Sequence, residues 1–154
     1  MTKFLIVCKA NVCRSPMALT IARQLTIQAG LANQLQFDSA GTHSARPSQK
    51  PDARTITALK KRGYLPGSIR SRSIDAKDFQ NFDVILAMDA DNLQALQKIC
   101  PTELQHKLRL FLSYATDTVL NEVPDPYYGT AAGFDRVLDL CESGIKALLR
   151  QRQL

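Results

Sequence analysis

The stretch Phe4-Leu-Ile-Val-Cys-Lys-Ala-Asn-Val-Cys-Arg-Ser-Pro16 decides the fold of this chain. Its first four residues, Phe4 to Val7, form a continuous apolar run, which is typical of a buried strand. Ser15 and Pro16 then predict a helix, because Ser is a favoured N-cap residue and Pro a favoured first helical residue. A strand, a short turn and a helix N-terminus in this order bind anions through backbone N–H groups and the helix dipole.

The turn carries the side chains that phosphate chemistry requires. Five residues separate Cys8 from Arg14, and a guanidinium grips two phosphate oxygens in a bidentate way that an ammonium does not match. The positive environment favours the nucleophilic thiolate form of Cys8, to which the Ser15 hydroxyl can donate. Asn11 suits a turn position with positive φ. The alternative is a chance Cys-x5-Arg pair, but the preceding strand and the following helix favour a phosphate loop.

Strands and helices alternate along the rest of the chain. Candidate strands lie at 4–7, 36–40, 83–88 and 108–114. Candidate helices run from Pro16 to a stop at Gly30, over 52–62 with Ala53, Ile56 and Leu59 inward, from a cap at Asp89 or Asp91 to Ile99, and along an apolar stripe from Phe134 to Leu148. This alternation predicts an α/β fold with a parallel sheet, helices on both faces, and a ligand site beyond the carboxyl ends of the strands.

A second chemical motif lies far from the first, at Pro124-Asp-Pro-Tyr-Tyr-Gly129. Two prolines restrict the backbone around Asp125, and a stiff loop is suited to hold a general acid against a leaving oxygen. Tyr127 and Tyr128 are placed to line a cleft and pack on a substrate ring. Taken without the first motif, the segment is better explained as a plain turn with surface tyrosines.

Bulk composition narrows the function classes. The 154 residues fit one domain, 1–154, with a formal charge of +6. No run of five or more basic residues appears and aromatics are only 6%, so we expect an anionic substrate and no nucleic acid. No stretch approaches the length of a membrane span and no signal peptide is evident, so we expect a cytoplasmic protein without membrane attachment, and a monomer. Four scattered cysteines and two histidines predict neither a disulfide scaffold nor a metal site.

Taken together, these residues resemble the low-molecular-weight protein tyrosine phosphatases over nearly the whole chain. The segments that carry the resemblance are Val7-Cys8 through Arg14-Ser15-Pro16, Ser39-Ala40-Gly41-Thr42, Asp78-Phe79, Phe82-Asp83, Ala87-Met88-Asp89, Asn92-Leu93, and Asp125-Pro126-Tyr127-Tyr128-Gly129 with Phe134 opening the last helix.

The resemblance implies a four-stranded parallel sheet and hydrolysis of phosphotyrosine in protein substrates through a phosphocysteine, without metal or cofactor. It implies Cys8 as nucleophile, Arg14 as phosphate clamp, and Asp125 as acid and then base. Cys13 matches a loop cysteine that would form a reversible disulfide with Cys8 under peroxide. The residues expected to bind phosphate or brace the loop are Lys9, Ala10, Asn11, Val12, Cys13, Ser15 and Ser39; those expected at the substrate cleft are Ala45, Arg46, Tyr127 and Tyr128.

The chain departs from the family pattern at three positions. Ala10 replaces a usual loop glycine, Ala45 replaces a usual cleft aromatic, and Ile69 aligns with a histidine that helps to hold the loop Asn in some members. Without that aromatic wall the preference for phosphotyrosine is less well specified, and Lys9 and Arg46 favour acidic peptides.

Three other activities fit parts of the pattern. An arsenate reductase would need a resolving cysteine pair, whereas Cys100 and Cys141 are isolated on predicted helices. A phosphoarginine phosphatase on this scaffold carries Thr where this chain has Val12. A phosphate-binding or phosphocarrier module would need the loop but no leaving-group acid, which leaves Asp125 without a purpose.

Overall fold

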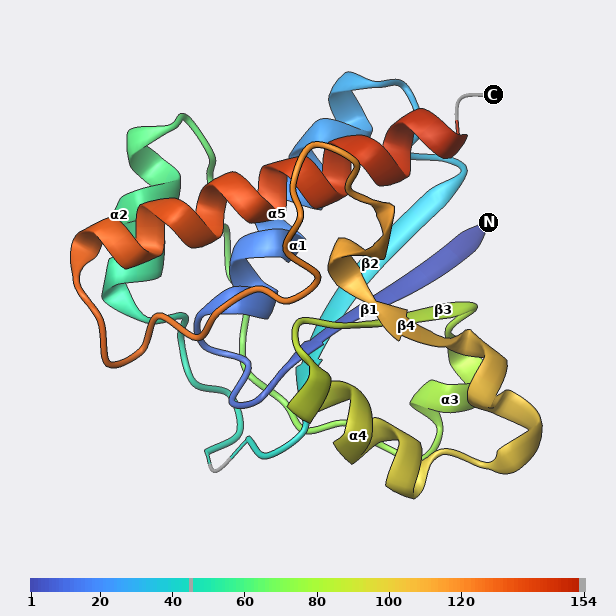
Figure 1. The fold of residues 1–154 in the computed structure, drawn as a ribbon. Helices are drawn as coiled ribbons and strands as arrows, with labels where there is room; N and C mark the ends of the chain where they lie inside the picture. The colour runs from blue at the N-terminus through green and yellow to red at the C-terminus, as the bar shows by residue number, and fades with distance from the viewer. Residues whose placement is uncertain (45, 153–154) are drawn as a thin grey trace.

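A computed structural model of the chain describes residues 1–44 and 46–152. Four strands, β1 (Thr2–Cys8), β2 (Leu35–Gly41), β3 (Val84–Ala87) and β4 (Leu108–Leu110), form one parallel sheet in the order β2-β1-β3-β4 (Figure 1). The helices are α1 (Arg14–Gln28), α2 (Ala53–Lys61), α3 (Asp78–Asn81), α4 (Ala90–Ile99) and α5 (Ala131–Arg152), with 3₁₀ turns η1 (Thr102–Lys107) and η2 (Phe111–Tyr114). The predicted α/β class with a four-stranded parallel sheet is confirmed.

The central strand explains why the sheet is covered on both faces. Phe4 and Ile6 belong to the larger core, which includes residues of α1 and α5, whereas Leu5 and Val7 belong to a second core that includes Phe79 of α3. Figure 1 shows α1, α2 and α5 on one side of the sheet and α3 and α4 on the other. A strand buried on both faces reads as a continuous apolar run, as observed at 4–7.

The fourth strand is shorter than predicted. It ends at Leu110, and residues 111–114 turn into η2 instead of continuing the ladder. The turn buries Phe111 completely in the larger core, where a Cβ added at Gly144 of α5 would collide with its ring. Packing against α5 therefore overrides the strand pattern of this apolar run.

Two details of the helices also differ from expectation. Helix α1 begins at Arg14, so Ser15 lies inside its first turn and does not cap it. On α2 the expected inward residue Ala53 is exposed, and the buried face is formed by Thr55, Ala58 and Leu59. The cap at Asp89 is confirmed, since its side chain accepts from the backbone of Asn92.

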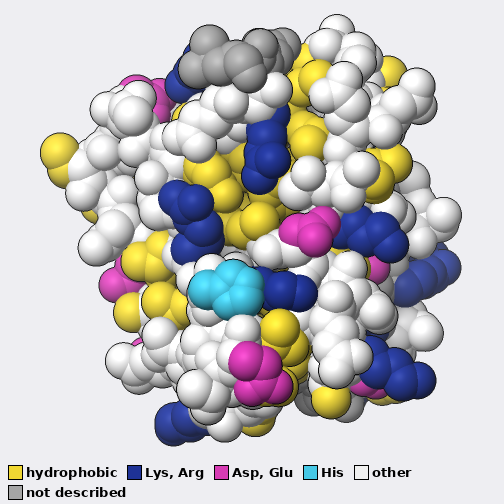
Figure 2. Space-filling model, turned by 90° about the vertical axis from the view of Figure 1, so that its right-hand side faces the viewer, with side chains coloured by type: hydrophobic (Ala, Val, Ile, Leu, Met, Phe, Trp, Pro, Cys, Tyr) yellow, Lys and Arg dark blue, Asp and Glu magenta, His cyan; other side chains and the backbone are white. Residues whose placement is uncertain are grey.

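No helix within the described part of the chain is long and apolar enough to cross a membrane. Figure 2 shows one face of the molecule on which Lys and Arg side chains are scattered, with Asp and Glu side chains between them.

Candidate active site

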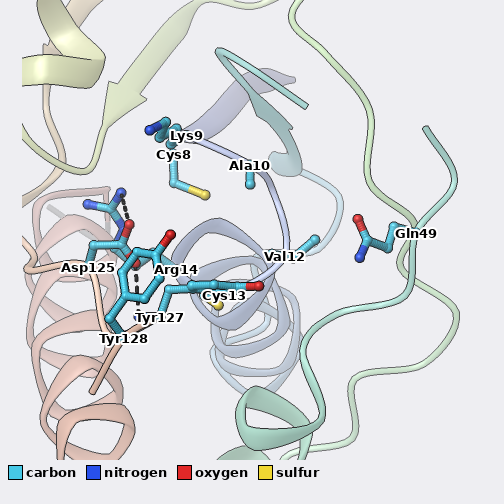
Figure 3. A pocket seen from close by; sticks show the side chains of 10 residues that line it. All are labelled: Cys8, Lys9, Ala10, Val12, Cys13, Arg14, Gln49, Asp125, Tyr127 and Tyr128. Atoms are coloured by element: carbon cyan, nitrogen blue, oxygen red, sulfur yellow. Dashed lines mark hydrogen bonds and ion pairs between the residues drawn. The ribbon is translucent and has the colours of Figure 1, made fainter. Parts of the chain in front are cut away.

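The carboxyl ends of the strands bring the distant motifs together. Cys8 ends β1 and pairs in register with Gly41 at the end of β2, and Asp89 follows β3 closely. A cavity of about 280 Å³ opens at this edge (Figure 3). Its lining residues are Cys8, Lys9, Ala10, Val12, Cys13, Arg14, Gln49, Asp125, Tyr127 and Tyr128. Two motifs separated by more than a hundred residues thus share one cavity.

The loop between β1 and α1 is braced from inside by Asn11. Its φ of 61° is the positive value expected for Asn at this turn. The Asn11 amide donates to Ser15 Oγ (2.7 Å) and to Ser39 Oγ (3.0 Å), and its oxygen accepts from the backbone N–H of Arg72 (3.0 Å). All of these contacts form with Ile69 in place of a histidine, so this chain holds the loop Asn through Ser15, Ser39 and the backbone of Arg72.

The loop is also tied from outside, through its carbonyl groups. The backbone of Thr42 donates to Cys8 O (2.9 Å), that of His43 to Lys9 O (2.8 Å), and that of Asp52 to Val12 O (2.8 Å). With these carbonyls bonded to the segment after β2, the loop has the curvature of an anion-binding nest.

Two small residues permit this close packing. A Cβ at Gly41 would lie 2.6 Å from Lys9 O and 3.1 Å from Asn11 N, so only glycine allows β2 to approach the loop backbone. Ala10, by contrast, is not among the described residues with positive φ, so its β-carbon causes no backbone strain there.

Cys8 lies at the end of the strand, 3% exposed. Its Sγ is 3.0 Å from Ser15 Oγ, and that hydroxyl also accepts from Asn11. Because one lone pair of Ser15 is used by the amide, its hydrogen is free to point at the sulfur. The hydroxyl that was expected to cap α1 therefore faces the thiol instead.

Arg14 is buried and oriented by three oxygens. Its Nη1 donates to Asp89 Oδ2 (2.6 Å) and to Val123 O (2.9 Å), and its Nη2 lies 3.7 Å from Asp125 Oδ2. Burial disfavours the charged guanidinium, but the hydrogen bond that Arg14 donates to Asp89 and the negative groups around it together outweigh burial and hold the pKa of Arg14 above its ordinary value. The guanidinium is therefore a permanent cation at the side of the cavity.

The acid loop places a half-exposed carboxylate opposite the thiol. The Asp125 side chain is 45% exposed, its Oδ1 accepts from the backbone of Tyr127 (3.1 Å), and Pro126 is buried beside it. The rings of Tyr127 and Tyr128 meet edge to face with centroids 4.9 Å apart. In Figure 3 Asp125 and both tyrosines lie together on one side of the cavity.

The second loop cysteine, Cys13, is a much weaker acid than a solvent-exposed cysteine. Burial, followed by the nearby Asp52 and Cys8, raises the pKa of Cys13 to about 12. Both loop cysteines are reduced and buried, and both line the cavity. Cys13 is therefore a neutral thiol at physiological pH.

Sequence reasoning missed two residues of the site, and one predicted cleft residue, Arg46, lies away from the cavity. Gln49 lines the cavity without any pattern that would have singled it out. Asp89 is predicted as a helix cap and as part of a segment that resembles the family, but not as a site residue, although its position after a parallel strand pointed to this edge. Arg46 is exposed and does not line the cavity, and Ala45 lies outside the described residues. Asn11, Ser15 and Ser39 lie buried beneath the loop.

Among the described residues no group of His, Cys, Asp or Glu is arranged to hold a metal ion. Cys100, just past the end of α4, and Cys141, on α5, are both buried.

Comparison with known proteins finds one family that matches nearly the whole chain. Residues 3–154 match the family described as low molecular weight phosphotyrosine protein phosphatase. Proteins of that name from Schizosaccharomyces pombe and Homo sapiens are 37% and 34% identical, covering 94% and 96% of this chain and 95% and 93% of theirs. A protein tyrosine phosphatase from Entamoeba histolytica superposes with a TM-score of 0.94 at 38% identity, covering 100% of both chains. The chain therefore belongs to the low molecular weight protein tyrosine phosphatases, hydrolases that act on phosphotyrosine.

Proposed function

We propose that this chain hydrolyses phosphotyrosine in proteins in two steps, with Cys8 as nucleophile, Arg14 as phosphate clamp and Asp125 as proton donor and acceptor. The observation that carries the proposal is the convergence of these three side chains on one cavity. The loop backbone and the first turn of α1 receive the phosphate dianion, and Arg14 grips its oxygens from a position fixed by Asp89.

In the first step the Cys8 thiolate attacks phosphorus and the bond to the tyrosine oxygen breaks. Asp125 gives its proton to the departing phenolate, which avoids expulsion of a strong base. In the second step the Asp125 carboxylate takes a proton from water, the resulting hydroxide attacks phosphorus, and the P–S bond breaks. Ser15 Oγ, 3.0 Å from the sulfur, stabilises the thiolate that leaves.

The cavity wall supports an aryl substrate. Tyr127 and Tyr128 lie beside Asp125 and Val12 lies on the loop, so apolar groups surround the position of the substrate ring. Lys9 at the cavity and Arg46 in the neighbouring segment add positive charge, and we expect acidic peptides to be preferred.

We infer that the protein works as a cytoplasmic monomer without a nucleic-acid partner. Among the described residues, the large exposed apolar side chains lie on separate elements except for the adjacent Tyr127 and Tyr128, instead of forming one wide patch; they are Met1, Ile27, Leu65, Ile99, Val119, Tyr127 and Tyr128. The Lys and Arg side chains on the face in Figure 2 are interspersed with acidic ones, which does not favour a phosphate backbone.

Redox control is a further part of the proposal. A peroxide that oxidises Cys8 to a sulfenic acid would be followed by attack of the Cys13 sulfur, loss of water and formation of a disulfide. Mild oxidation should then remove two hydrogens from a Cys8–Cys13 peptide, and dithiothreitol should restore both the mass and the activity. Irreversible sulfinic acid at Cys8 without any disulfide would contradict this role.

The decisive assay is phosphate release in reducing buffer with EDTA, from peptides carrying phosphotyrosine, phosphoserine or phosphoarginine. We expect release from phosphotyrosine alone, and none from Cys8→Ser, which should still bind phosphate. Turnover by Cys8→Ser would refute the covalent route. Preferential release from phosphoarginine would refute the aryl specificity.

A further inference from the structure

Arg54, in the first turn of α2, lies outside the cavity and has no part in the chemistry above. It nevertheless contacts the acid loop, and its own helix is bonded to the phosphate loop. These connections make it the candidate for a function that neither motif suggests.

The Arg54 guanidinium is held rigidly by a neighbour in sequence. Its Nε donates to Asp52 Oδ1 (3.0 Å) and its Nη2 to Asp52 Oδ2 (3.0 Å), which is the bidentate geometry of a strong Arg–carboxylate pair. The same Asp52 oxygen caps α2 by accepting from the backbone of Arg54 (2.9 Å). The side chain is therefore fixed relative to the helix start.

Two aromatic rings lie against this fixed cation. Arg54 Cζ is 4.6 Å from the ring centre of Phe134 and 5.5 Å from that of Tyr127, both within cation–π range. Phe134 is anchored in the core with 1% exposure, whereas Tyr127 is 45% exposed. Arg54 thus connects an exposed tyrosine of the acid loop to a ring buried in the core.

The acid loop has few other polar ties to the rest of the protein. Within residues 124–130, the backbone of Tyr127 donates to the Asp125 side chain and the backbone of Gly129 donates to Pro126 O. Both hydrogen bonds stay inside the loop and do not connect it to the rest of the protein. The ion pair of Asp125 with Arg14 is long, at 3.7 Å. Burial of Pro126 fixes one point of the loop, and the stacking of Tyr127 on Arg54 fixes a second.

The segment that carries Arg54 is also bonded to the phosphate loop. The backbone N–H of Asp52 donates to Val12 O at 2.8 Å, between the nucleophile and the clamp in sequence. One short segment, Asp52 to Arg54, therefore bridges the two loops whose relative position decides whether a proton reaches the leaving oxygen.

We propose that Arg54, held by Asp52, is a positioning residue that sets the acid loop against the phosphate loop through Tyr127. The inference rests on the proposed acid role of Asp125. Losing the cation releases Tyr127 and lets Asp125 drift from its proton-transfer distance, while the phosphate loop keeps its own bonds. The loss of activity should therefore be larger for substrates whose leaving group must be protonated than for substrates whose leaving group need not be.

The test compares kcat/KM for a phosphotyrosine peptide with kcat/KM for an aryl phosphate whose leaving group needs no proton. Asp125→Ala should lower the ratio by about 10²-fold or more. Arg54→Met, which keeps the length of the side chain, should lower it roughly tenfold, and Arg54→Lys should fall between Arg54→Met and wild type. Arg62→Met removes the arginine directly after α2, which is paired with Asp139 and Glu142, and should leave the ratio unchanged.

A double variant separates positioning from a general loss of structure. Combining Arg54→Met with Asp125→Ala should lower the ratio no further than Asp125→Ala alone, because both act on the same proton transfer. Equal losses on the two substrates in Arg54→Met, or additive losses in the double variant, would overturn the positioning role. If Asp125→Ala itself shows no selective loss, the acid assignment fails, and the inference fails with it.

Asp52→Asn supplies the second route to the same answer should Arg54→Met fold poorly. Asn caps helices as well as Asp does, so this change weakens the hold on Arg54 while keeping the cap of α2. It should lower the substrate ratio in the same direction, and an unchanged ratio would count against the proposal.

Discussion

Replacing Gly41 by Ala should damage phosphate binding more than its small size suggests. The added Cβ would lie 2.6 Å from Lys9 O, against about 3.4 Å for an ordinary contact, so the loop and the strand end must separate by about 0.8 Å. Both partners are backbone, and no side chain can rotate away. The backbone bonds from Thr42 and His43 to the loop would stretch together with it.

The expected magnitudes follow from that displacement. Overpacking of this kind costs about 1–3 kcal/mol of folding stability, and misplacement of catalytic groups by about 1 Å costs on the order of 10²-fold in rate. We therefore expect Gly41→Ala to lower the urea midpoint moderately. We also expect it to weaken inhibition by inorganic phosphate and to lower kcat/KM for every substrate, whatever the leaving group.

Gly144→Ala provides the matched control, because its Cβ would collide with the buried ring of Phe111 in the core instead of with the loop. It should cost comparable stability, yet bind phosphate normally below its unfolding transition. The reasoning would be refuted if phosphate inhibited Gly41→Ala as strongly as wild type, or if Gly144→Ala lost as much phosphate affinity as Gly41→Ala.

Three further expectations concern charges at the site. Asp89→Asn should cost about 1–3 kcal/mol in urea unfolding, because buried Arg14 loses its anionic partner, and saturating phosphate should reduce that cost by supplying a counter-charge. Arg14→Lys should lower kcat/KM strongly and weaken phosphate inhibition, since an ammonium cannot reproduce the bidentate grip; unchanged inhibition would contradict the clamp. The pKa of Cys13 rises from about 9 in its ordinary state to about 12 on folding. Its contribution to stability is therefore complete below pH ~9 and lost as pH rises toward ~12, so Cys13→Ala should show a shallower alkaline loss of stability than wild type.

The elements that sequence alone predicts well are those whose causes are local. The apolar run at 4–7, the turn after it and the positive φ of Asn11 all follow from neighbouring residues, and the structure shows each of them. The fourth strand fails for the opposite reason. Residues 108–114 have a strand pattern throughout, but the burial of Phe111 against α5 is a tertiary preference that no local window contains.

The residues of the site divide in the same way, into those with a local sequence signal and those without one. Cys8, Arg14 and Asp125 were predictable because each lies in a motif with a chemical purpose, whereas Arg54 lies in an ordinary first turn of a helix. Its contacts with Tyr127 and Phe134 join residues more than seventy positions apart. Nothing in the sequence near Arg54 indicates which rings will lie against it.

Asp89 shows how a correct local explanation can hide a functional one. Its role as a helix cap accounts for only one carboxylate oxygen, Oδ1, which accepts from Asn92 at 2.7 Å. The other oxygen holds Arg14 at 2.6 Å, across 75 residues of sequence. A capping Ser or Thr would satisfy the helix with its single oxygen and leave the arginine without an anion. A helix-capping carboxylate directly after a parallel strand uses only one of its two oxygens for the cap. Its second oxygen should therefore be expected to contact a residue or ligand at the ligand-binding edge of the sheet.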